Sequence, residues 1–172
     1  SLHLKATGAQ VTFSTVLGDD PLKDFVIDGL KDSGIKLDAI IDPTRPTINK
    51  NVVIAEGYRL LKIDTLDNRP VSESILKKLI QSITNSPADG VAFCDFRHGI
   101  FSRMSVPLLT EAIPPNIFSV ADSQVASRWG NITEFKGFDL ITPNERESRF
   151  ALGDQDSTIG ALSGLLHEQA EN

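Results

Sequence analysis

Two hydrophobic patterns alternate along the chain and predict a succession of strands and helices. Short apolar runs rich in β-branched residues, bounded by Gly, Pro or Asp, indicate strands, and apolar residues three or four positions apart indicate helices. Strands are predicted at residues 10–17, 37–41, 90–95, 117–122 and 137–141. Helices are predicted at residues 1–7, 21–33, 73–83, 107–112, 144–151 and 158–168, with a helical turn at 133–136.

Two of these helices carry clear start signals. Asp20 precedes Pro21, and an Asp N-cap followed by Pro at the first helical position is a common helix start. The apolar residues of that helix fall on one face, at Leu22, Phe25, Val26 and Leu30. Ser72 is the expected cap of the next long helix. That helix is expected to bury Ile75, Leu76, Leu79, Ile80 and Ile83.

Residues 47–55 and 58–64 have a different pattern, in which apolar and polar residues alternate. Glu56-Gly57 lies between the two segments. Alternating segments joined by a two-residue turn that ends in Gly predict a β-hairpin. A hairpin inserted into a succession of strands and helices suggests a flap or lid, which we place at residues 46–65.

The order of elements predicts an α/β fold with a doubly wound, mostly parallel sheet and a β-hairpin lid. The run at residues 90–95 is almost wholly apolar, as in parallel strands that are buried on both faces. We expect a single domain over residues 1–172. The pattern begins with the end of a helix and finishes with a helix, so we expect a sheet that is incomplete at both ends.

Composition narrows the classes of function. The 172 residues are 40% hydrophobic and 23% charged, which is ordinary for a globular domain. The net charge of -6 and the sequence pI of about 5.0 argue against nucleic-acid binding, which depends on neutralising phosphates. No apolar run approaches the ~20 residues of a membrane span. With one cysteine, Cys94, and no visible signal peptide, we expect a cytoplasmic protein.

Polar residues follow several of the predicted strands. Parallel strands end at one edge of a sheet, where open α/β sheets bind their ligands. A group of carboxylates there would repel unless a cation or hydrogen bonds intervened, and oxygen ligands suit Mg²⁺. The alternative is that each Asp caps the next helix, which we favour for Asp20 and consider equally plausible for Asp122. The residues concerned are Asp19, Asp20, Asp95, Asp122, Asn144 and Glu147.

Asn144 and Glu147 allow two interpretations. They follow the strand at 137–141, which Pro143 ends. An Asn three residues before a Glu resembles a capping box, which satisfies helix N–H groups and needs no ligand. The local pattern favours the capping interpretation, whereas the position after a strand favours a ligand site.

The remaining candidates are cations and aromatic residues. Lys50, Arg59 and Lys62 lie on the lid, where they would either close over a phosphorylated substrate or form a solvated strand face, and the local pattern favours the second. Arg97 and His98 could steady a phosphate, although most loop histidines are exposed. Phe13, Phe93 and Phe138 are expected in the core, and Trp129 is either a hydrophobic plug or a contact surface.

Taken in order, these motifs resemble the ribokinase-type (PfkB) carbohydrate kinase family, with the heptose-7-phosphate kinase half of bacterial ADP-heptose synthase as the nearer match. The family's "LGA-x-V…G-x-D" segment resembles residues 7–11 and 18–20. Its lid strands resemble residues 46–50 and 60–64. "SDY-x-KG" corresponds to residues 94–99, and N-x-x-E to Asn144 and Glu147.

The resemblance implies an enzyme that transfers a phosphoryl group from ATP to a sugar hydroxyl with Mg²⁺. Asn144 and Glu147 would place the metal and the phosphates, with Glu147 as metal ligand. Substrate-side residues would be Asp20, Lys50, Arg59, Asp95 and His98. The resemblance also implies a homodimer through the lid strands.

The chain departs from the family at several points. His98 replaces the lysine of "SDY-x-KG", and Ser123-Gln124 replace a "PK" pair. The family's glycine-rich substrate segment and its G-A-G-D motif, which holds the general base and borders the adenine pocket, have no counterpart in these residues. We therefore expect the 172 residues alone to be inactive. One alternative is a non-catalytic α/β module that binds sugar or nucleotide, and another is a relative acting on fructose phosphate or a nucleoside.

Overall fold

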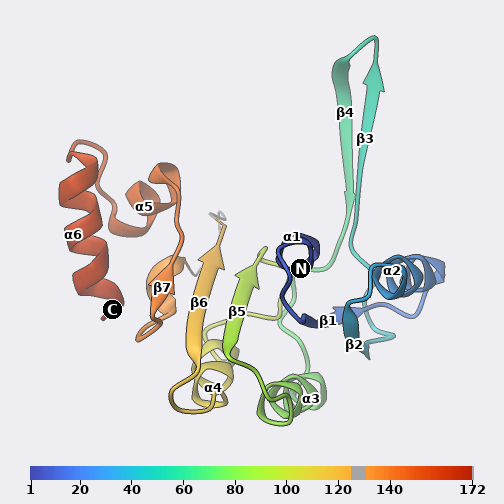
Figure 1. Ribbon diagram of the computed structural model, residues 1–172. Helices are drawn as coiled ribbons and strands as arrows, with labels where there is room; N and C mark the ends of the chain where they lie inside the picture. Colours follow the sequence, from blue (N-terminus) through green and yellow to red (C-terminus); the bar gives the residue numbers. More distant parts are fainter. Residues whose placement is uncertain (125–130, 172) are drawn as a thin grey trace. The chain divides into compact units, whose positions relative to one another are not determined.

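The computed structural model describes residues 1–124 and 131–171 (Figure 1). Residues 125–130 and 172, among them Trp129, lie outside the described residues. The chain divides into two compact units, Ser1–Ser82 and Ile83–Asn172. The expectation of a single domain over residues 1–172 stays a prediction. None of the described helices is both long and apolar enough to cross a membrane.

The first unit is built around a parallel pair of strands, β1 and β2. They pair in register from Thr12 opposite Lys36 to Leu17 opposite Ile41, and α2 connects them. This is the βαβ arrangement that the sequence predicts. The elements of this part of the chain are α1 (Leu2–Ala6), β1 (Thr12–Leu17), α2 (Pro21–Asp32), β2 (Lys36–Ile41), β3 (Asn49–Ala55), β4 (Tyr58–Thr65) and α3 (Glu73–Thr84), whose last residues lie beyond the unit.

The helices of this unit form where predicted, but their apolar faces are less buried than expected. Asp20 caps α2, as predicted, yet α2 contains no buried residue, and Phe25 is 78% exposed. In α3, Ile75 and Leu79 are buried, whereas Leu76, Ile80 and Ile83 are only partly so. Helical periodicity predicts a helix, but burial depends on what packs against it, which the pattern does not contain.

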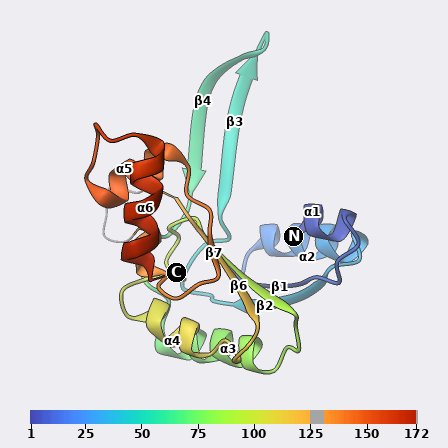
Figure 2. The ribbon, with the colours of Figure 1, turned by 60° about the vertical axis from the view of Figure 1, so that its left-hand side comes forward.

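The predicted lid is the antiparallel hairpin of β3 and β4. In Figures 1 and 2 it extends as a long ribbon away from the sheet of its own unit. Glu56 and Gly57 form the turn with φ of 50° and 84°, and two successive positive φ angles are the requirement of a type I′ hairpin turn. Every residue of β4, and every residue of β3 after Asn49, is exposed. The hairpin therefore presents both of its faces to the surroundings.

The second unit contains a three-stranded parallel sheet in the order β5-β6-β7. Gly90 lies opposite Phe118 and Asp95 opposite Ser123, while Val120 lies opposite Leu140. Figure 1 shows the three strands side by side. The elements are β5 (Gly90–Asp95), α4 (Ser105–Glu111), β6 (Phe118–Ser123), the 3₁₀ turn η1 (Ile132–Glu134), β7 (Leu140–Ile141), α5 (Glu145–Leu152) and α6 (Ile159–Ala170).

Four phenylalanines form the centre of the second unit. The ring centroids of Phe93 and Phe101 lie 5.1 Å apart, and those of Phe135 and Phe138 lie 5.7 Å apart in an edge-to-face arrangement. Phe135 is 0% exposed and Phe138 is 1% exposed. The expectation that Phe93 and Phe138 belong to the core is confirmed, whereas Phe13, on β1, is only partly buried.

The last strand is shorter than predicted. Gly137 has a φ of 70°, and its N–H donates to the carbonyl of Ala170 at the end of α6. The carboxylate of Asp139 accepts bonds from the Ser119 N–H (2.7 Å) and hydroxyl (2.8 Å). Gly137 is thus bonded to the end of a helix, and Asp139 is bonded to β6 through its side chain. The backbone pairing of β7 with β6 therefore begins only at Leu140.

Replacing Phe135 by Ala is expected to lower the free energy of unfolding by about 3–5 kcal/mol, because it removes a fully buried ring from a packed cluster. Phe150→Ala is the matched control, since Phe150 is 46% exposed, and it is expected to change stability by less than about 1 kcal/mol. Urea unfolding followed by circular dichroism measures both. Equal losses in the two variants would contradict this description of the core.

Candidate functional site

The three strands of the second unit end at one edge, as the sequence predicts. Asp95 and Ser123 are opposite each other at the ends of β5 and β6. The Thr142 hydroxyl, just after β7, donates to Oδ1 of Asp122 at 3.1 Å. Polar groups from three strands therefore meet at the carboxyl edge of this sheet, where ligands of α/β proteins bind.

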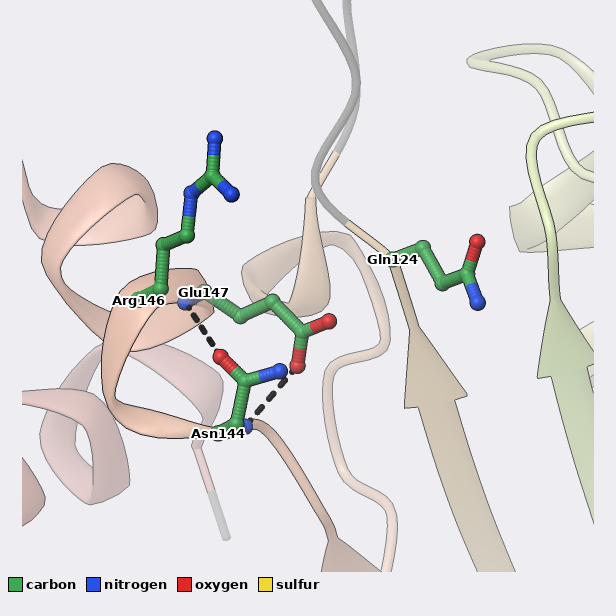
Figure 3. Close-up of a pocket in the computed structure, with 4 residues that line it drawn as sticks. All are labelled: Gln124, Asn144, Arg146 and Glu147. Atoms are coloured by element: carbon green, nitrogen blue, oxygen red, sulfur yellow. Dashed lines mark hydrogen bonds between the residues drawn. The ribbon is translucent and has the colours of Figure 1, made fainter. Parts of the chain in front are cut away.

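Asn144 and Glu147 form a complete capping box at the start of α5 (Figure 3). Oδ1 of Asn144 accepts from the Glu147 N–H at 2.9 Å, and Oε2 of Glu147 accepts from the Asn144 N–H at 2.8 Å. The capping interpretation is thus confirmed. Within the described residues, Oε1 of Glu147 and the side-chain amide N–H groups of Asn144 make no hydrogen bond, so the box leaves groups that could hold a ligand.

A shallow pocket of about 210 Å³ lies between this box and the end of β6. Its lining residues are Gln124, Asn144, Arg146 and Glu147. In Figure 3 the Glu147 carboxylate reaches into the space between α5 and Gln124, and the Arg146 side chain extends away from the capping pair. Sequence reasoning missed Arg146, although its place inside the N-x-x-E motif was a signal that could have found it.

Asp95 and Arg97 are joined in a buried pair. Asp95 is 2% exposed, its Oδ2 lies 3.0 Å from Nη1 of Arg97, and its Oδ1 accepts from the Arg97 N–H. The other guanidinium nitrogens donate to the Ser123 hydroxyl (2.7 Å) and the Gln124 carbonyl (3.0 Å). Burial raises the pKa of Asp95, and the charge of Arg97 partly offsets that rise. Since every guanidinium nitrogen is engaged within the protein, this arrangement does not favour a phosphate-binding role for Arg97.

His98 follows this pair directly in the loop after β5. The chain turns at Arg97, whose φ is 65°. His98 is only partly exposed, and its Nε2 atom is buried, whereas Phe96 on the other side of Arg97 is 49% exposed. The expectation that a histidine in this loop is simply exposed is therefore wrong, because the ring is only partly exposed and one of its nitrogens is buried. A role for His98 toward substrate stays a prediction.

In the first unit, the Asp20 carboxylate is held by backbone N–H groups. Oδ1 accepts from Leu22 (3.1 Å) and Lys23 (3.3 Å), which is the predicted helix cap. Oδ2 accepts from the N–H of Thr47 at 2.7 Å, and this bond is the largest cause of the lowered pKa of Asp20. Both oxygens of Asp20 are therefore occupied by the protein's own backbone.

The chain segments that enter and leave the lid are joined by a second set of charges, which we call the lid clasp: Asp42, Arg45, Asp67 and Arg69. Arg45 and Asp42 form an ion pair of 2.9 Å whose side chains are 8% and 6% exposed. Arg45 also donates to the Arg69 carbonyl at 3.2 Å, and Arg69 donates to the Thr44 carbonyl at 3.1 Å. These bonds connect the approach to β3 with the exit from β4.

The predicted lid cations lie on the exposed hairpin. Lys50 is on β3 and Arg59 on β4, and both are exposed. Lys62 forms an ion pair with Asp64 at 2.9 Å. The exposure agrees with the solvated strand face that the local pattern favours, and a role for Lys50 and Arg59 toward substrate stays a prediction.

The described residues contain no group of three or more His, Cys, Asp or Glu side chains arranged to hold a metal ion. The hypothesis that carboxylates at the strand ends form a Mg²⁺ cluster stays a prediction, although Asp20 is engaged by backbone N–H groups and Asp95 by Arg97. A single carboxylate still fits Mg²⁺, which is commonly held by one or two protein carboxylates together with water and substrate phosphates. Oε1 of Glu147 meets that description.

Comparison with known proteins identifies relatives over nearly the whole chain. The family described as pfkB family carbohydrate kinase matches residues 2–172. The bifunctional protein HldE of Pelobacter propionicus is 27% identical over 97% of this chain and 35% of its own length, and that of Campylobacter fetus is 30% identical over 95% and 36%. The D-beta-D-heptose 7-phosphate kinase of Bordetella bronchiseptica is 25% identical over 88% and 47%. The chain thus spans between 35% and 47% of these relatives.

Solved structures agree on the fold. Phosphofructokinase-2 from Escherichia coli superposes with a TM-score of 0.73 at 12% identity, covering 99% of this chain and 56% of that one. Ribokinase from Giardia lamblia superposes with a TM-score of 0.68 at 18% identity, covering 92% and 49%. The predicted ribokinase-like α/β fold is confirmed.

The stability of the lid clasp is expected to depend on pH. Hydrogen bonds from Arg69 lower the pKa of Asp67 to about 2 from its ordinary value of 3.8. A lowered folded-state pKa means that the pair stabilises the clasp fully above pH ~4 and that this contribution is lost as the pH falls toward about 2. In Arg69→Gln the titration midpoint of Asp67 is expected to rise toward 3.8, as measured by carboxyl-carbon NMR. Arg59→Gln, on the exposed hairpin, is the control and should leave the midpoint unchanged.

Proposed function

The chain belongs to the pfkB family of carbohydrate kinases, and from this premise we propose that the protein containing it phosphorylates a sugar, with a heptose phosphate as the substrate. In that reaction a sugar hydroxyl attacks the γ-phosphorus of ATP, the bond to ADP breaks, and the hydroxyl proton passes to a base. Such catalysis consists mainly of positioning and of charge stabilisation. The observation that carries the proposal is the capping box whose Glu147 oxygen faces the pocket at the end of β6.

Each residue of the pocket suits one part of this task. When bound, Mg²⁺ would neutralise charge on the ATP phosphates. Glu147 would hold the metal through Oε1 while its Oε2 stays on the Asn144 N–H, which fixes the carboxylate in place. The side-chain amide of Asn144 would donate to a phosphate oxygen, and Arg146, which also lines the pocket, would supply a cation.

The sugar side of the site is proposed from the family resemblance and from the names of the relatives. Lys50 and Arg59 are exposed cations on the lid and would contact the phosphate of the sugar. Asp95 and His98 would border the sugar, with Asp95 acting mainly through its pair with Arg97.

We propose a cytoplasmic location, because ATP and sugar phosphates are cytoplasmic metabolites. We expect activity in the whole protein and none in these 172 residues alone.

The two faces of the lid support a homodimer. Directly paired residues share a face, so Val53 and Leu61 lie together with Ile63, while Lys62 and Asp64 lie on the opposite face. Leu61 is 53% exposed and Ile63 49%, and a two-stranded hairpin with exposed apolar residues is only marginally stable by itself. We propose that the apolar face packs against the lid of a second subunit and that the charged face covers the sugar.

A non-catalytic binding module is the second candidate, and one observation favours it. Asp20 and Asp95, two of the carboxylates at the strand ends, are both engaged within the protein. A module of this kind would bind ATP or a sugar phosphate without transferring phosphate. Formation of ADP and phosphorylated heptose by the whole protein separates the kinase from the module.

Replacing Glu147 by Gln in the whole protein is expected to lower kcat about 10- to 100-fold and to raise the Mg²⁺ concentration needed for half-maximal rate. Gln keeps an oxygen for the Asn144 N–H, so the helix cap survives while the metal loses its charged ligand. Glu145→Gln is the control, because Glu145 forms its ion pair with Arg149 within α5. A Mg²⁺ dependence unchanged in Glu147→Gln would contradict the metal role.

Leu61→Asp is expected to convert the proposed dimer to a monomer, because it places two carboxylates in an apolar contact between lids. Val52→Asp is the control on the charged face, where Lys62 is directly opposite. Light scattering coupled to size-exclusion chromatography measures the mass. A wild-type protein that is monomeric at all concentrations would overturn the dimer.

A further inference from the structure

We propose that Asp20 is a positioning residue that, together with Gly18, fixes the root of the lid to the turn after β1. The family resemblance implies that Asp20 borders the substrate, whereas its bonds point to a different role. The proposal rests on the proposed function only in that the lid covers a substrate. The attachment itself is a property of the protein without substrate.

The first support is that the two carboxylate oxygens of Asp20 accept hydrogen bonds from different segments of the chain. A helix cap needs one side-chain oxygen, and Oδ1 serves the N–H groups of Leu22 and Lys23. Oδ2 instead reaches a residue 27 positions away, the N–H of Thr47, at 2.7 Å. One side chain therefore joins the start of α2 to the segment that leads into β3.

The second support is the close approach of the backbone at Gly18. Its N–H donates to the hydroxyl of Thr47 at 3.0 Å. A Cβ at this position would lie 2.5 Å from both the Arg45 carbonyl oxygen and the Thr47 nitrogen, which is too close for any side chain. Glycine is required here for space, because only its lack of a side chain lets the two segments touch.

Thr47 is the point at which both bonds converge. It is 3% exposed, and β3 begins only two residues later, at Asn49. Beyond Asn49 every residue of both hairpin strands is exposed. The buried attachment of the lid is therefore concentrated at its root, and a closing motion would take place beyond Thr47.

The neighbouring Asp19 provides a natural comparison. Its carboxylate contacts the Lys23 side chain at 2.6 Å, and its side chain is 59% exposed. Within residues 1–124 and 131–171 it makes no hydrogen bond to the lid segment. The two adjacent aspartates thus differ in one respect that matters here, because Asp20 is bonded to Thr47 and Asp19 is not.

The test is hydrogen–deuterium exchange of the chain without substrate, followed in residues 47–55 and in α2. Asn can cap a helix as well as Asp but has a single acceptor oxygen. Asp20→Asn is therefore expected to leave exchange in α2 within about twofold of wild type and to speed exchange in residues 47–55 about tenfold. Asp19→Asn is the control and should change neither segment.

Two further pairs of variants distinguish the effect of losing these contacts from a general loss of stability. Thr47→Val removes the acceptor for the Gly18 N–H and should speed exchange at the root, whereas Thr47→Ser keeps the hydroxyl and should retain wild-type exchange. Gly18→Ala should loosen residues 47–55, whereas Gly29→Ala, whose Cβ would meet nothing within 4 Å, should not.

A substrate-binding role for Asp20 would give a different result and would overturn the proposal. If Asp20 is a substrate ligand, Asp20→Asn would weaken binding of heptose phosphate while lid exchange without substrate stays as in wild type. If the whole protein lacks kinase activity but Asp20→Asn still loosens the root, the proposed function fails and the positioning role stands.

Discussion

Parallel pairing of β5, β6 and β7 is the constraint on which the candidate site depends. The register places Asp95 opposite Ser123. It also places β7 beside β6, so that Asn144, which follows β7 in the chain, lies at the same edge. Residues distant in sequence meet because parallel strands end at the same edge. The contact between Phe93 and Phe138 stabilises this sheet from within, and the pocket depends on both the pairing and the core.

Several carboxylates, some of which the sequence offers as ligand-binding groups, are instead bonded to other groups of the protein. Asp20 accepts three backbone N–H bonds, Asp42 is paired with Arg45, and Asp95 is paired with Arg97. Each is satisfied by donors from the protein, and for Asp42 and Asp95, which are buried, such partners are required. Glu147 differs, because its capping bond uses one oxygen and leaves the other toward the pocket.

The lid shows how local and tertiary information combine. Its strands and its turn at Glu56-Gly57 were predicted from the residues, because alternation and turn chemistry are local properties. The bonds that hold its root were not predicted. Thr47 has no local feature that indicates contact with Gly18 and Asp20, from which α2 and β2 separate it in the sequence.

The sequence by itself determined the parallel α/β class, the hairpin and the capping box, since each follows from patterns within a few residues of one another. Only the tertiary structure decided which polar groups are occupied. Burial of Asp95, exposure of Phe25 and the place of Arg146 in the pocket depend on what packs beside them. The physical reason is that hydrogen bonds and burial are settled between segments far apart in the chain, and no local pattern encodes a distant partner.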